Sequence, residues 1–305
     1  MDLSIVIVTY NSGDHILATL ESIPAGVGGL SHEIIVVDNA SSDGTPQRVR
    51  HAFPDVAVIE AGQNRGFAAG CNAGLAQAQG RLLLLLNPDA QPHPGALRRL
   101  VDYLDHDPKA GIAAPRMVDP QGQTRLNAYP EFTVGLVLWQ YLGLDRLFPN
   151  RVFGVYRRAL GTGDMPFEVA WAQGSCLLLR REVFEAVGGL DEGFFLFVEE
   201  ADFCQRARAS GWHTMIVPQA AVTHAESSVV SQYPAIKVRA HHLSPLHYFR
   251  KRGKHAAVLT LKLGFTLELG IKGLVRLAQF LIRRDELAQR RLQAYSSTLR
   301  EVWVY

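Results

Sequence analysis

The sequence predicts an α/β fold with a mostly parallel central sheet flanked by helices and a helical extension at the carboxyl end. Short runs of Val, Ile and Leu alternate with segments of helical spacing over the first third of the chain. Polar residues follow three of these runs, as expected where the carboxyl ends of parallel strands form a ligand site. A basic and apolar segment replaces the alternation after about residue 250.

Length and composition exclude several classes of protein. The 305 residues are 48% hydrophobic and 20% charged, which is typical of a folded globular chain and not of a disordered or collagen-like one. The formal net charge of +2 gives no support for a nucleic-acid partner. Three cysteines are too few for a disulfide framework and favour a reducing compartment. Met1 and Asp2 lead directly into an apolar run without a basic segment, so we expect no signal peptide and a cytoplasmic location.

Four short apolar runs are predicted to be strands that are buried on both faces, because Asn, Asp, Gly or Pro bound them. They cover residues 3–8, 33–37, 56–59 and 81–86. Helical spacing is found between them, over residues 16–23, 45–52 and 67–78. Strands that alternate with helices in this way predict parallel pairing.

Further along the chain the pattern is less regular. Residues 111–171 have weak periodicity and are predicted to be an insertion that shapes the cleft of a second substrate. After the insertion we predict a strand over 172–179, helices over 181–187 and 199–210, and a strand over 213–217 that leads to 222–224. The chain is therefore divided into one domain of residues 1–240, with halves 1–110 and 111–240, and an extension of residues 241–305.

The extension combines apolar and basic character. Its residues 256–282 are apolar but interrupted by Lys262, Glu268, Lys272 and Arg276, so they lack the uninterrupted span of a transmembrane helix. Between Arg250 and Arg291 there are eleven Lys and Arg against three acids, which is a net charge of 11 − 3 = +8. Such a segment can lie in an anionic membrane interface, or form a helical hairpin packed on the body or on a second copy.

Two aspartates follow predicted strands. Asp89, at the end of Asn87-Pro88-Asp89, can hold a divalent cation together with water and phosphate oxygens, or can cap the helix that begins near Pro94. Asp38 can accept hydrogen bonds from the ribose or base of a nucleotide, or can be a turn residue. No glycine-rich phosphate-binding loop follows any predicted strand, which disfavours an ATPase or a dinucleotide oxidoreductase.

Other candidates lie near helix ends. Gly70 and Gly74 are one turn apart and predict close packing of their helix on the sheet, whereas Asn64 and Gly66 at the exposed end are better placed to contact a ligand.

The densest acidic cluster of the chain consists of Glu199, Glu200 and Asp202 at a predicted helix start. The helix dipole favours acids there, but a carboxylate beside the aromatic run 193–197 can also serve as a general base. His224 ends an apolar strand and is either a metal ligand or an ordinary polar residue.

Seven motifs occur in the order found in one known family. They are SIVIVTYN (4–11), VDNASSDG (37–44), NRGFAAG (64–70), LNPD (86–89), GSCLLLRR (174–181), GGLDE (188–192) and EEAD (199–202). Together they resemble the family-2 inverting glycosyltransferases of the GT-A fold, in particular their bacterial rhamnosyltransferase-like branch, over about residues 1–230. The resemblance implies that the chain moves a sugar, rhamnose in this branch, from a nucleotide-diphosphate donor to a hydroxyl of a saccharide acceptor.

The resemblance also implies a role for each candidate. Donor contacts fall to Thr9, Tyr10, Asn11, Asp38, Asn39, Asn64, Gly66 and Asn87. Asp89 and His224 would hold Mg²⁺ or Mn²⁺ on the diphosphate, although Asn87 replaces the first acid of the family's metal motif. Glu200 is the implied general base, and Glu199 is its acidic neighbour. Acceptor contacts fall to Trp171, Gly174 and Asp202.

The implied acceptor is a cell-surface glycan or a lipid-linked saccharide, and a lipid-linked acceptor would give the basic, apolar extension a reason to lie at the cytoplasmic face of the inner membrane. Two other classes of function are considered. A nucleotidyltransferase would carry a glycine- and base-rich segment after its first strand, where this chain has Thr9, Tyr10, Asn11 and Ser12. A non-catalytic glycan- or partner-binding scaffold could keep the fold without the candidate residues Asp89, Glu200 and His224.

Overall fold

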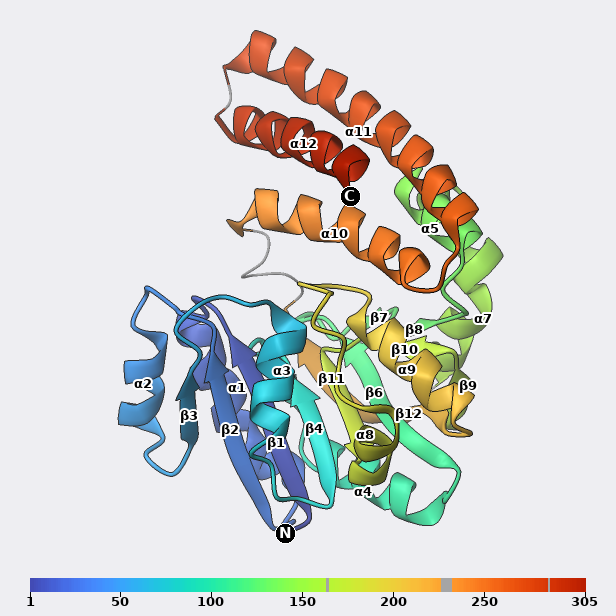
Figure 1. Ribbon diagram of the computed structural model, residues 1–305. Helices are drawn as coiled ribbons and strands as arrows, with labels where there is room; N and C mark the ends of the chain where they lie inside the picture. Colours follow the sequence, from blue (N-terminus) through green and yellow to red (C-terminus); the bar gives the residue numbers. More distant parts are fainter. Residues whose placement is uncertain (163–164, 226–231, 285) are drawn as a thin grey trace. The chain divides into compact units, whose positions relative to one another are not determined.

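The computed structural model describes residues 1–162, 165–225, 232–284 and 286–305 (Figure 1). The chain separates into two compact units. The first unit consists of Met1–Glu131, Phe153–Glu192 and Glu199–Glu226. The second unit consists of Phe132–Val152, Gly193–Val198 and Ser227–Tyr305.

A ten-stranded sheet forms the centre of the first unit (Figure 1). Its order is β3-β2-β1-β4-β11-β6-β12-β5, with β7 beside β6 and β9 beside β12. The bounds are β1 (Leu3–Thr9), β2 (His32–Asp38), β3 (Ala57–Glu60), β4 (Leu82–Leu86), β5 (Ala90–Pro92), β6 (Ala110–Val118), β7 (Thr124–Arg125), β9 (Phe167–Val169), β11 (Cys176–Arg180) and β12 (His213–His224). Strands β1 to β4 pair in parallel, β6 pairs in parallel with β12, and β11 runs antiparallel between β4 and β6. The predicted α/β fold is confirmed.

Helices cover both faces of this sheet. On one face lie α1 (Gly13–Val27), α2 (Thr45–Ala52) and α4 (Ala96–His106), and on the other lie α3 (Phe67–Leu75), α8 (Arg181–Val187) and α9 (Glu199–Ala209). Successive strand residues point to opposite faces, so Ile5 and Ile7 join one core while Val6 and Val8 join the other. Burial on both faces explains why the strand segments are apolar without alternation.

The middle of the chain differs from the prediction. The expected insertion at residue 111 is wrong for its first part, because Ala110–Val118 is the central strand β6 between β11 and β12. This strand is rich in Ala and Gly, so it lacks the apolar signal of the other strands although Ala113 and Ala114 are fully buried. The strand expected over 172–179 is split into β10 (Trp171–Ala172), which pairs with β8 (Ala128–Tyr129), and β11.

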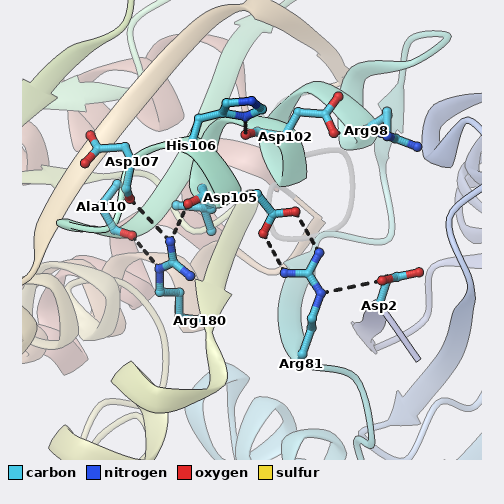
Figure 2. Close-up of polar contacts among 10 residues, drawn as sticks. Asp2, Arg81, Arg98, Asp102, Asp105, His106, Asp107, Ala110 and Arg180 are labelled. Atoms are coloured by element: carbon cyan, nitrogen blue, oxygen red, sulfur yellow. Dashed lines mark hydrogen bonds and ion pairs between the residues drawn. The ribbon is translucent and has the colours of Figure 1, made fainter.

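Arginine side chains tie α4 to the amino ends of the parallel strands (Figure 2). Arg81 donates to the two carboxylate oxygens of Asp105 at 2.6 and 2.8 Å and lies 3.5 Å from Asp2. The hydrogen bond from Arg81 lowers the pKa of Asp105 below its usual value. Arg180 donates to the backbone carbonyls of Leu104 and Ala110. These charged groups at the amino edge of the sheet therefore form hydrogen bonds that connect parts of the fold.

Helix α3 packs closely on the sheet, as predicted from its glycines. A Cβ on Gly74 would lie 2.4 Å from Cγ1 of Val6, and one on Gly70 would lie 2.6 Å from Cγ1 of Val8. We expect Gly74→Ala to lower the free energy of unfolding by about 1–3 kcal/mol, because neither the helix nor the strand can move away without losing core contacts. Urea unfolding measures this loss.

The matched control is Gly161→Ala in α7 (Pro149–Thr162), where nothing lies within 4 Å of the added Cβ. This variant should be neutral or slightly stabilising, because Ala is the better helix former. Equal unfolding midpoints for Gly74→Ala and the wild type would contradict the close approach.

The second unit is helical (Figure 1). It contains α5 (Val134–Tyr141), α6 (Leu144–Leu147), α10 (Pro234–Arg250), α11 (His255–Arg283) and α12 (Glu286–Val304). Helix α11 continues through all three of its glycines and packs against α12, so the two form a hairpin. No helix among the described residues has the length and apolar character that crossing a membrane requires. Helix α10 of this second unit already starts at Pro234, so the helical unit does not begin at the predicted residue 241. The functional division at residue 240 stays a prediction.

Candidate active site

Polar loops meet at the carboxyl edge of β1 and β2. The register pairs Thr9 with Asp38, the last residues of the two strands. The backbone N–H of Asn11 donates to Oγ of Ser41 at 2.8 Å, and Oδ1 of Asn11 accepts from the backbone N–H of Ser42 at 2.7 Å. These hydrogen bonds join the two loops, so the candidate donor residues after both strands lie close together at this edge.

Several buried polar atoms at this edge have no hydrogen-bond partner within the described part of the chain. They are Oγ1 of Thr9, Oδ1 of Asp38 and Oδ1 of Asn39. The other oxygen of Asp38 accepts from the backbone N–H of Ser41 at 2.9 Å, so Asp38 is a turn residue and still presents a second acceptor. Leaving buried polar atoms unpaired is costly, and a ligand with hydroxyl and N–H groups would satisfy them.

Asn64 and Gly66 shape the start of α3. Gly66 has φ 93°, a backbone conformation that favours glycine, and its N–H donates to Oδ1 of Asn64 at 3.0 Å. Nδ2 of Asn39 donates to the carbonyl of Gly66 at 3.0 Å. The structure therefore brings Asn39, Asn64 and Gly66 together.

Asp89 and His224 lie side by side although 135 residues separate them in the chain. Strand β12 pairs with β5 so that His224 is opposite Ala90, the residue after Asp89. Nε2 of His224 is 3.0 Å from Oδ1 of Asp89 and 3.4 Å from Nδ2 of Asn87, and Asp89 and His224 are both buried. Helix α4 has Gly95 as its N-cap and no side-chain cap, so Asp89 is not its cap.

Asp89 and His224 carry donor atoms of kinds that bind divalent cations. A carboxylate suits both Mg²⁺ and Mn²⁺, and a neutral imidazole is a common metal ligand in proteins. Among the described residues, no three or more His, Cys, Asp or Glu gather as a metal site. A cation held by these two side chains would therefore take its other ligands from phosphate oxygens and water.

The acidic cluster begins α9. Glu199 and Glu200 are 3% and 9% exposed, so their carboxylates are shielded from water. A Cβ on Gly174 would lie 3.6 Å from Cβ of Glu200, which places the predicted acceptor residue Gly174 beside the predicted base. Burial raises the pKa of the Cys71 thiol in α3, and the nearby charges of Glu199 and Glu200 raise it further. Both acids thus lie close to α3.

Two predicted acceptor residues and one predicted donor residue have other contacts. Asp202 is fully buried, and its Oδ2 accepts from Nε of Arg206 at 2.9 Å, which is a structural ion pair. Trp171 stacks on Tyr129 with 4.1 Å between the ring centroids. Tyr10 is half-buried after β1. An acceptor role for Asp202 and Trp171 and a donor role for Tyr10 stay predictions.

Left-handed backbone occurs in these loops and, elsewhere in the chain, directly before the acidic cluster. Asn11 and Ala40, in the loops after β1 and β2, have φ of 49° and 64°. Phe197 and Val198, directly before Glu199, have φ of 67° and 74°. Such conformations are costly for residues with a Cβ, above all for β-branched Val198, and they concentrate at functional sites.

Sequence reasoning missed two serines of this edge. Oγ of Ser12 and Oγ of Ser175 are buried and lack a hydrogen-bond partner within the described residues. Ser12 follows Asn11, and the carbonyl of Ser175 accepts from the backbone N–H of Asn87 at 2.9 Å. Each serine directly follows a predicted site residue, Asn11 or Gly174, and this position in the sequence could have indicated it.

Comparisons with known proteins identify the family to which the chain belongs. Residues 4–188 match the model of "Glycosyl transferase family 2". The chain is 30% identical over 303 residues to N-acetylglucosaminyl-diphospho-decaprenol L-rhamnosyltransferase of Mycobacterium tuberculosis (strain CDC 1551 / Oshkosh), covering 95% of each chain. It is 32% identical over 213 residues to the low-salt glycan biosynthesis hexosyltransferase Agl10 of Haloferax volcanii, covering 68% of this chain and 62% of Agl10.

Solved structures show the same fold. The mannosyltransferase PcManGT from Pyrobaculum calidifontis, in complex with GDP-Man and Mn²⁺, has a TM-score of 0.56 at 17% identity, covering 99% of this chain and 86% of that chain. TarS of S. aureus, residues 1–349, has a TM-score of 0.53 at 14% identity, covering 98% of this chain and 90% of that chain. The fold is the GT-A glycosyltransferase fold, and the chain is a glycosyltransferase that belongs to glycosyl transferase family 2.

Proposed function

We propose that this enzyme transfers L-rhamnose from a nucleoside-diphosphate donor to a hydroxyl of a lipid-linked saccharide. The observation that carries the proposal is the similarity, over 95% of both chains, to a relative named as an L-rhamnosyltransferase that acts on N-acetylglucosaminyl-diphospho-decaprenol. The product would extend a cell-surface polysaccharide.

The donor would lie across the carboxyl edge of β1, β2 and β4. The buried oxygens of Thr9, Asp38 and Asn39 would contact the nucleoside, because they are acceptors that the described chain leaves unsatisfied. The diphosphate would lie toward Asp89 and His224. When bound there, Mg²⁺ or Mn²⁺ supplies positive charge that stabilises the departing diphosphate.

Glu200 is proposed as the general base. Its carboxylate takes the proton of the acceptor hydroxyl, and the hydroxyl oxygen forms a bond to the anomeric carbon on the face opposite the diphosphate. The bond from that carbon to the diphosphate oxygen breaks, and its electron pair leaves with the nucleoside diphosphate. One displacement inverts the anomeric configuration. Gly174 supports this role, because the absence of a side chain there leaves space beside Glu200.

The two halves of the domain would bind different substrates, and the acceptor would determine where the enzyme is located. Residues 1–110 would bind the donor, and residues 111–240 would bind the acceptor and supply the base. A lipid-linked acceptor would bring the enzyme to the cytoplasmic face of the inner membrane, with residues 241–305 as the segment that contacts the membrane or a second copy.

Release of nucleoside diphosphate from a panel of sugar nucleotides, with and without Mn²⁺, tests the proposed function. We expect release from a nucleoside diphospho-rhamnose, dependent on the metal and accelerated by a lipid-linked N-acetylglucosamine acceptor. Transfer of a different sugar would overturn the rhamnose assignment. Absence of both release and donor-induced thermal stabilisation across the panel would overturn the proposed donor site.

A further inference from the structure

Helix α11 exposes its apolar side to solvent. We define its outer face as Leu259, Leu263, Leu267, Ile271, Leu274, Val275, Leu281 and Ile282, all of which are between 51% and 80% exposed. These residues recur at spacings of three, four and seven, and Leu277 and Ala278 fill the interval between Val275 and Leu281. They therefore form one stripe along the helix. At 1.5 Å per residue, the 29 residues of α11 extend over roughly 43 Å. Exposed apolar surface on this scale marks an interaction site.

The inner face of α11 is already packed within its own unit. Leu261, Phe265 and Leu269 are buried, and the ring of Phe265 lies 4.9 Å from that of Tyr141 in α5. Nε2 of His242 in α10 lies 2.9 Å from Oε2 of buried Glu268. These contacts determine which side of α11 faces outward, so the exposed stripe is a consequence of the fold.

Charged side chains of α11 are held away from the outer face. Burial raises the pKa of Glu268, but hydrogen bonds from His242 and Lys272 outweigh it and leave the pKa below its usual value. Nζ of Lys272 is thereby drawn to Glu268, and Nζ of Lys262 lies 5.7 Å from the ring centroid of Trp303 in α12. Of the exposed residues between 256 and 282, all of which are described, Lys272 alone is charged.

Basic residues flank the stripe in the sequence on both sides. Arg250, Lys251, Arg252 and Lys254 precede α11, and Arg283, Arg284, Arg290 and Arg291 follow or end it. In a symmetric pair of α11 helices, parallel or antiparallel, each basic end would meet another basic end, which is unfavourable. An anionic lipid surface instead complements both ends and accepts the apolar stripe between them.

We propose that the outer face of α11 inserts into the interfacial region of an anionic lipid bilayer, with the helix lying in the membrane plane. The physiological reason rests on the proposed function, because a lipid-linked acceptor is presented at such a surface. The exposure and charge that define the face are independent of the acceptor.

Flotation of the full chain with vesicles tests this proposal. The wild type should float with phosphatidylcholine–phosphatidylglycerol vesicles and at least about tenfold less with phosphatidylcholine alone, because basic residues are attracted to an anionic surface. The variant Leu263→Gln, Leu267→Gln, Ile271→Gln should lose flotation with anionic vesicles. The control variant Val155→Gln, Met165→Gln removes exposed apolar side chains of the first unit and should float like the wild type.

Two further measurements separate the outcomes. The triple variant should keep metal-dependent nucleoside diphosphate release, which shows that it is folded. A wild type that releases the diphosphate but floats with neither vesicle would overturn the membrane proposal and leave the proposed function intact. A wild type that floats but releases nothing from any donor would overturn the proposed function and leave the membrane proposal intact. Sedimentation showing a dimer that the triple variant dissociates, without flotation, would assign the face to a second copy.

Discussion

Replacing Glu200 by Gln should lower the rate of sugar transfer by about 10²–10⁴-fold, the contribution typical of a general base. The amide has nearly the shape of the carboxylate but cannot take the acceptor proton. Donor binding should be unchanged, because the proposed nucleoside contacts lie in the loops after β1 and β2. Steady-state transfer assays and calorimetric titration with the nucleoside diphosphate measure the two effects.

Glu199→Gln is the matched control, since Glu199 is also buried and lies in the same helical turn. It should retain far more activity than Glu200→Gln. If the Glu199 variant were inactive and the Glu200 variant active, the base would be Glu199. Near-normal turnover in both variants would remove the carboxylate base from the mechanism.

Replacing Asp89 by Ala should weaken donor binding and lower transfer together, by about a hundredfold or more in rate. The reason is that a catalytic cation contributes several kcal/mol of charge stabilisation and Asp89 is the carboxylate that would hold it, 3.0 Å from His224. The variant should also lose the difference between assays with and without Mn²⁺. Titration of the nucleoside diphosphate in the presence of Mn²⁺ measures the binding effect directly.

Asp119→Ala provides a control for loss of a buried carboxylate. Asp119 is 4% exposed, and its Oδ2 lies 2.9 Å from Arg125 in β7. Its removal should cost stability without changing the Mn²⁺ dependence. If Asp89→Ala kept the metal dependence of the wild type, the cation would be held elsewhere.

Local patterns were sufficient to predict the first half of the sheet. The apolar runs of β1, β2 and β4 and the small residues Gly70 and Gly74 of α3 are signals within short segments. Strand β6 was missed because five of its nine residues are Ala, Gly or Pro, so it carries little of the Val, Ile and Leu enrichment that marks a strand. Its place in the sheet is decided by pairing with β11 and β12, which lie more than sixty residues away.

The candidate site shows the same limit. The sequence places Asp89 and His224 at strand ends, but only the antiparallel register of β5 and β12 brings them to 3.0 Å. The left-handed backbone at Phe197 and Val198 has no sequence signal, because both residues avoid that conformation. In α11 Glu268 turns inward, since it finds His242 and Lys272 as partners. Contacts of this kind are tertiary and cannot be derived from helical spacing.

The anomeric configuration of the transferred sugar tests the proposed mechanism most directly. The one-bond carbon–hydrogen coupling at the anomeric carbon of the product, measured by NMR, is compared with that of the donor. Direct displacement by an acceptor oxygen that Glu200 deprotonates predicts the opposite configuration in the product. A product with the configuration of the donor would contradict a single displacement from the face opposite the diphosphate.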